Sequence, residues 1–139
     1  MVVEFKYHRS TAISQNCTDT KMGSAFRDLN RLSTVSAEEK YLVYVFDDHM
    51  QNYYQGCKGN PADPKFFFDA VAQSASIGKV YQIGDANPDP NLCGKDFLAN
   101  AFDGFGAGYK SFSAFSYGIK VIFAGSIAPN RHMVIYQVM

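Results

Sequence analysis

The stretch KYLVYVFDD, residues 40–48, is nearly continuous in apolar character until it ends in two aspartates. Valine, tyrosine and phenylalanine favour strands, and an unbroken apolar run is typical of a strand that is covered on both faces. Asp47 and Asp48 fit a strand-to-helix turn in which one carboxylate caps the helix. We therefore predict a central buried strand here, followed by a short helix over HMQNYYQ.

The segments on either side of this strand predict an α/β fold. Upstream, VVEFKYH (2–8) reads as a strand, and apolar residues recur every three or four positions from Met22 to Leu32, as in a helix. Downstream, we predict helices over 64–75 and 95–102 and strands over 79–84, 118–125 and 132–139. This order predicts a mixed central sheet flanked by helices.

Length and composition bound the class of protein. The chain has 139 residues, 47% of them hydrophobic, which predicts a single domain over residues 1–139. Thirteen basic residues balance thirteen acidic ones, so no overall basic charge indicates nucleic-acid binding. Three widely spaced cysteines favour a reduced, cytoplasmic protein, and no apolar run approaches the length of a membrane span.

Two charged residues interrupt the first predicted strand. Alternate side chains of a strand point the same way, so Glu4 and Lys6 share one face while Val3, Phe5 and Tyr7 share the other. This places a carboxylate beside an ammonium group. Such a pair is either half of a metal site or an ion pair on an edge strand, where it would discourage association with other strands.

The succession VVEFKYHR, a helix containing RDLNRLS, and the strand YLVYVFDD resembles the PD-(D/E)XK nuclease superfamily over about the first fifty residues. The resemblance implies a restriction-endonuclease-like fold and Mg²⁺-dependent hydrolysis of DNA, with roles in restriction or defence. It assigns Glu4 as a metal ligand and Lys6 to the attacking water and the developing phosphate charge. Asp28 and Arg31 on the helix would support them.

In that family, an aspartate on a strand before E-x-K also binds the metal, and this chain starts at the E-x-K strand. The expectation is either that N-terminal elements of the family core are missing, that another chain supplies them, or that the domain is degenerate. Asp47 is a substitute second ligand, at the end of a neighbouring strand. Without the metal site, Asp28 and Arg31 would be a surface salt bridge on the helix.

Two further functions are compatible with the sequence. One is a non-catalytic interaction protein, such as an immunity or inhibitor protein, which binds a protein partner or a second copy through an aromatic surface. The other is a metal-independent ribonuclease of the toxin type. Its acid and base would be His49 and His132, with Lys6 or Arg131 nearby, because an imidazole titrates near neutral pH.

Overall fold

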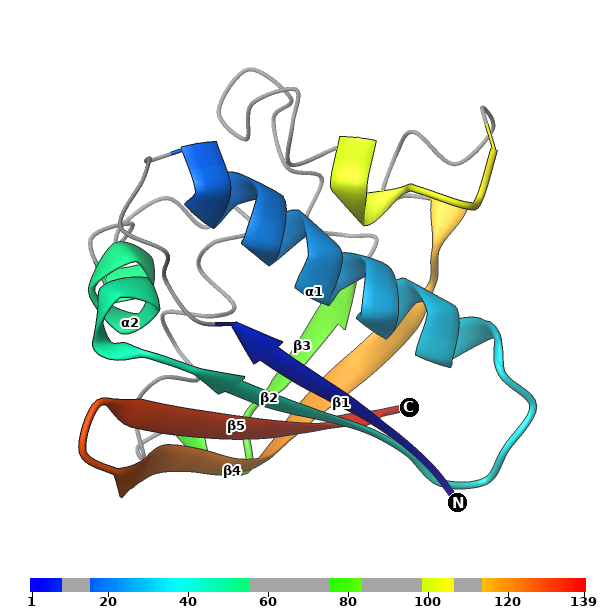
Figure 1. The fold of residues 1–139 in the computed structure, drawn as a ribbon. Helices are drawn as coiled ribbons and strands as arrows, with labels where there is room; N and C mark the ends of the chain where they lie inside the picture. Colours follow the sequence, from blue (N-terminus) through cyan, green and yellow to red (C-terminus); the bar gives the residue numbers. More distant parts are fainter. Residues whose placement is uncertain (9–15, 56–75, 84–98, 107–113) are drawn as a thin grey trace.

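The computed structural model describes residues 1–8, 16–55, 76–83, 99–106 and 114–139. They form a mixed α/β fold (Figure 1). The elements are β1 (Val2–His8), α1 (Asn16–Thr34), β2 (Lys40–Phe46), α2 (Asp48–Gln55), β3 (Val80–Ile83), β4 (Tyr117–Ala128) and β5 (Arg131–Val138). The five strands make one sheet in the order β1-β2-β5-β4-β3, in which β1 and β2 are parallel and the other neighbours antiparallel.

The elements follow the predicted order, and several bounds differ; strand β4, for example, runs three residues beyond the predicted 118–125. The helix predicted from residue 22 begins six residues earlier and runs to Thr34, and the strand expected to reach the aspartates ends at Phe46. It ends there because the carboxylate of Asp47 accepts the Met50 backbone N–H at 3.1 Å and so caps α2. The predicted helix over 64–75 lies outside the described residues, and residues 99–101 of the predicted helix over 95–102 are helical.

Helix α1 covers one face of the sheet and packs on β1, β2 and β5 (Figure 1). Its apolar stripe is fully buried, as the spacing predicts, and consists of Met22, Ala25, Phe26, Leu29 and Leu32. The alternate strand residues beneath it are also buried: Leu42, Tyr44, Phe46, Val134, Tyr136 and Val138. No described helix is long and apolar enough to span a membrane.

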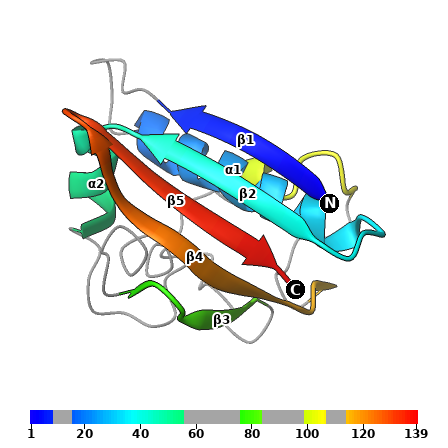
Figure 2. The ribbon, with the colours of Figure 1, turned by 90° about the horizontal axis from the view of Figure 1, so that it is seen from below.

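The opposite face of the sheet is apolar and partly exposed. Figure 2 shows the strands from this side, with α1 behind them, and none of the described helices lies over it. The face carries Val3, Phe5, Tyr7, Val43, Val45, Met133 and Ile135, which are exposed or half-buried. Phe5 on the edge strand β1 is 76% exposed. The structure therefore has one well-filled core and one open apolar sheet face.

A buried side-chain amide on α1 links the helix to Ala101 and to the start of strand β4. The Asn30 side chain donates to the Ala101 carbonyl at 3.1 Å and accepts the Tyr117 hydroxyl at 2.7 Å. Asn30 is fully buried. Removing its amide would therefore leave the Ala101 carbonyl and the Tyr117 hydroxyl without a partner, and water could not take its place. Burial of Tyr117 itself raises the pKa of its hydroxyl well above the ordinary value and keeps this hydroxyl a donor.

We expect Asn30→Ala to lower the free energy of unfolding by about 2–4 kcal/mol, because it strands the Tyr117 hydroxyl and the Ala101 carbonyl. In a double-mutant cycle with Tyr117→Phe, measured by denaturant unfolding, the coupling should be about 1–2 kcal/mol. Additive effects would contradict the role of this link.

Candidate functional site

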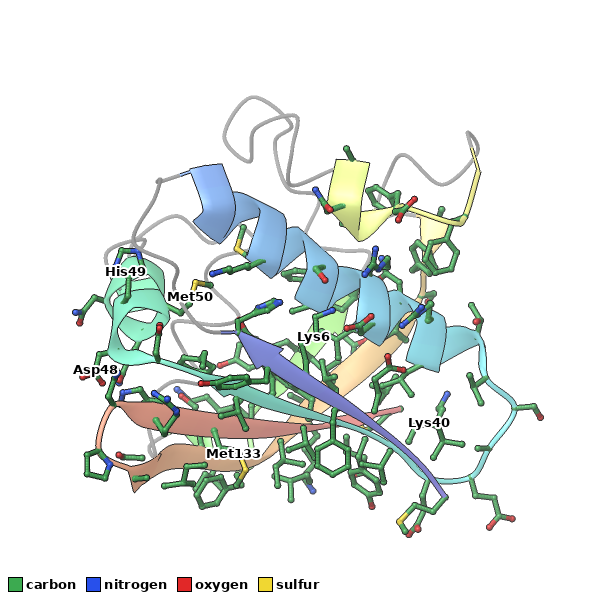
Figure 3. All side chains as sticks on the ribbon, in the orientation of Figure 1. Lys6, Lys40, Asp48, His49, Met50 and Met133 are labelled. Carbon is green, nitrogen blue, oxygen red and sulfur yellow. The ribbon has the colours of Figure 1, made fainter. Side chains whose placement is uncertain are left out.

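The charged residues of β1 point toward α1. Exposure alternates along the strand, with Val3, Phe5 and Tyr7 on the outer side and Glu4 and Lys6 on the side that faces the helix. Figure 3 shows Lys6 between β1 and α1, while Met133 points away from the opposite face. The polar face of the strand, rather than its apolar face, therefore lies against the helix.

Asp28 and Arg31, one helical turn apart on α1, meet these two side chains. Lys6 Nζ lies 2.6 Å from Asp28 Oδ2. Arg31 Nη2 donates to Asp28 Oδ1 and to Glu4 Oε1, both at 2.8 Å. The four residues singled out by the family resemblance thus form one ion-pair network, in which Glu4 and Asp28 share a single guanidinium nitrogen.

Burial makes this network more than a surface ion pair. Asp28 is 1% exposed, so the expectation of a surface salt bridge between Asp28 and Arg31 is wrong although the contact itself is present. The contact between Lys6 and Asp28 is an ion pair whose geometry does not meet that of a hydrogen bond at Asp28 Oδ2. A buried carboxylate needs compensating charge, and Lys6, Arg31 and the more distant Arg27 supply it.

A cavity of about 300 Å³ opens beside the network. It is lined by Arg27, Arg31, Asp103, Gly104 and Phe105. Arg27 donates to Asp103 at 3.0 Å, and Gly104 has a φ of 84°, a backbone conformation that favours glycine at this turn. Two guanidinium groups one turn apart on the helix fit an anion with several acceptor oxygens, such as a phosphate.

The structure does not bring Asp47 to this network. Glu4 is opposite Leu42 in the β1–β2 register, and Asp47 follows Leu42 by five residues. At about 3.3 Å per residue, this separates the two positions by roughly 16 Å along the strands. Asp47 is instead the buried cap of α2, which leaves Asp28 as the carboxylate closest to Glu4 in this network.

Glu4 and Asp28 are donors of the kind that Mg²⁺ prefers. The ion usually binds one or two carboxylates and completes its shell with waters and substrate phosphates. Among the described residues, no group of three or more His, Cys, Asp or Glu side chains could hold a metal. Two carboxylates match the number that Mg²⁺ usually takes from a protein, but Arg31 Nη2 is bonded to an oxygen of each and Asp28 is 1% exposed, so cation binding requires the network to rearrange.

The two histidines of the ribonuclease hypothesis lie at one end of the sheet, where α2 follows β2. His132 is opposite Phe46 in the β2–β5 register, and its Nε2 lies 2.5 Å from Asp48 Oδ1. His49 is exposed on α2 (Figure 3). The polar contact of His132 is thus with the acidic neighbour of His49, and its ring lies against Phe46.

A third histidine, which the ribonuclease hypothesis leaves without a role of its own, ends β1. His8 follows Glu4 and Lys6 on the same side of β1, and its Nδ1 lies 2.9 Å from the Tyr44 hydroxyl. Burial, helped by the charges of Lys6 and Lys21 and opposed by Asp47, lowers the pKa of His8 from 6.5 to about 3. The strand alternation was a signal that could have placed His8 beside the network.

The partners of Arg27 were also missed. Its i,i+4 spacing from Arg31 places both guanidinium groups on one side of α1. Nothing in the sequence indicates that Asp103, distant along the chain, would meet them.

Comparison of the chain with protein-family models, with curated proteins and with solved structures finds no match. The chemistry of the site is therefore argued from its own residues.

We expect Asp28→Ala to lower the free energy of unfolding by about 3–5 kcal/mol, because it leaves Lys6 and Arg31 without their buried counter-charge. Asp48→Ala is the matched control. It removes an exposed carboxylate paired with His132 and should cost no more than about 1 kcal/mol. Equal losses for the two variants in chemical denaturation would mean that burial of Asp28 is not important.

The lowered pKa of His8 predicts a pH dependence of stability. Below pH 6.5 the unfolded chain binds a proton at His8, whereas the folded chain does so only near pH 3. The free energy of unfolding should therefore fall as the pH falls through this window, by up to about 1.4 kcal/mol per unit from this group. Denaturant unfolding of His8→Gln should show a shallower fall with falling pH than wild type. Parallel curves for wild type and His8→Gln would contradict the shift.

Proposed function

We propose that this chain is a nuclease domain that hydrolyses DNA phosphodiester bonds with Mg²⁺ held by Glu4 and Asp28 and with Lys6 beside them. The observation that carries the proposal is the convergence of two carboxylates and an ammonium group between β1 and α1, with Lys6 Nζ 2.6 Å from Asp28 and Glu4 joined to Asp28 through Arg31. The resemblance to the PD-(D/E)XK superfamily assigns Glu4 and Lys6 to the catalytic site and gives Asp28 a supporting position, and we propose Asp28 as the second ligand in place of Asp47.

Each residue has a role that its position supports. Glu4 and Asp28 would hold the ion, and Mg²⁺ bound there supplies neutralising charge and an acidified water. Lys6 lies against Asp28 and can stabilise negative charge that develops on a phosphate beside it. Arg27 and Arg31 line the neighbouring cavity, where they can bind and orient the phosphate group.

The ion pairs suggest how the substrate would prepare the site. Arg31 donates to Oε1 of Glu4 in the free protein, so this oxygen is engaged before a cation binds. A phosphate entering the cavity competes with Glu4 for the Arg31 guanidinium, because both are anionic acceptors. Binding of the phosphate would thereby release Glu4, and the carboxylate becomes a ligand only when substrate is present.

A second candidate function is a non-catalytic interaction protein. It is favoured by the open apolar face of the sheet, where Phe5 is 76% exposed and Tyr7 half exposed. Contiguous apolar patches of this kind often mark binding surfaces. A degenerate nuclease domain would combine the two, retaining the ion-pair network for stability and the open face for binding.

The test is cleavage of plasmid DNA, single-stranded DNA and RNA by the purified chain with Mg²⁺, with Mn²⁺ and with chelator. We expect metal-dependent DNA cleavage, reduced at least about 100-fold in Lys6→Ala and in Glu4→Gln. Lys120→Ala and Glu38→Gln are matched controls away from the network and should cleave as wild type does. Thermal unfolding of every variant confirms that it is folded.

The other outcomes separate the alternatives. Chelator-resistant cleavage of RNA that is lost in His132→Ala would favour the ribonuclease hypothesis. Absence of cleavage under all conditions by the folded chain would refute the nuclease proposal and favour an interaction protein.

A further inference from the structure

We propose that β1 is a self-complementary edge, which pairs antiparallel with β1 of a second copy and is centred on Phe5. Strand β1 is at the end of the five-stranded order, and its other side has no strand partner among the described residues. The pairing would join two sheets into one across a two-fold axis. It concerns assembly and does not depend on the proposed nuclease activity.

The backbone of β1 presents its free hydrogen-bonding groups at odd positions. The Val2 N–H donates to the Glu39 carbonyl at 2.8 Å, at the start of the parallel ladder with β2. Successive residues of a strand turn their N–H and C=O groups to opposite sides. The groups of Val3, Phe5 and Tyr7 therefore point to the open edge, where an added strand would meet them.

The charges select one antiparallel register. The outward N–H and C=O groups can bond only if odd-numbered residues of one copy lie opposite odd-numbered residues of the other. Three such pairings keep most of the short strand paired, and their two-fold axes pass through Glu4, Phe5 or Lys6. The pairing centred on Glu4 places two glutamates directly opposite each other, and the pairing centred on Lys6 does the same with two lysines. Like charges that lie directly opposite each other destabilise both of these pairings. The register about Phe5 places Glu4 opposite Lys6 of the partner subunit in both directions. Glu4 and Lys6 thus disfavour the two pairings centred on themselves and favour the pairing centred on Phe5.

The exposed side chains suit the same register. Phe5 would lie opposite Phe5 of the partner subunit, and Val3 opposite Tyr7 of the partner subunit, all on the open sheet face. Aromatic and β-branched cross-strand pairs of this kind are stabilising. Phe5 is 76% exposed in the single chain, so it has the most surface to lose. A formal net charge of zero adds no overall repulsion between copies.

The first test is the mass of the particle in solution, measured by sedimentation equilibrium from about 1 to 200 μM, a range suited to a small edge interface. We expect a monomer–dimer equilibrium in wild type. Phe5→Pro removes both the outward N–H and the exposed ring and should weaken association at least about tenfold with the fold retained, because proline is tolerated on an edge strand. Ile127→Ser, which removes another exposed apolar side chain, should dimerise as wild type does.

A second variant fixes the register and decides the outcome if Phe5→Pro does not fold. Cα atoms of a hydrogen-bonded antiparallel pair are about 5.5 Å apart, which is within reach of a disulfide. Phe5→Cys should therefore link to itself under mild oxidation, identified by mass spectrometry of the joined peptides. Val3→Cys should not link to itself, because it faces Tyr7 of the partner subunit.

Three results would overturn the proposal. They are a monomeric wild type throughout the concentration range, a dimer that folded Phe5→Pro leaves unchanged, and self-linkage of Val3→Cys in place of Phe5→Cys.

Discussion

A carboxylate that is 1% exposed determines how β1 sits in this structure. Asp28 cannot be buried as an anion without nearby positive charge, and Lys6 on β1 supplies part of that charge across the gap between strand and helix. A shift of β1 by one residue would turn Lys6 and Glu4 away from α1 and bring Phe5 beneath it. The buried charge therefore fixes the register of β1, and its apolar side faces outward as a consequence.

Much of the fold could be predicted from local periodicity. The apolar stripe from Met22 to Leu32 predicted the buried side of α1, and the run over 40–46 predicted a central strand. The grouping of Glu4 and Lys6 followed from the period of two in a strand. What periodicity did not indicate was which side of β1 would face the helix, because its apolar side is the one usually buried. The position of Asp28 decides this, and its burial depends on tertiary packing.

Contacts between distant parts of the chain could not be predicted in the same way. Asn30 meets Ala101 and Tyr117, and Arg27 meets Asp103, in each case across about half the chain or more. No spacing rule links such positions, since loop closure brings them together only in the folded chain. Asp47 illustrates a different difficulty, because an aspartate after a strand can bind a metal or cap a helix. Its bond to the Met50 N–H identifies the cap.

The network also explains why stability and chemistry are difficult to separate here. Arg31 joins Glu4 to Asp28, so the contact that helps to hold β1 on α1 also occupies the acidic group that a cation would need. Arg31 is half exposed and lines the cavity, whereas Asp28 is buried. A change of partner at Arg31 would free Glu4 but would also break the bond of the same nitrogen to Asp28, which would then keep Lys6 as its nearest counter-charge. Arg31 is therefore the residue through which an anion in the cavity could act on both carboxylates at once.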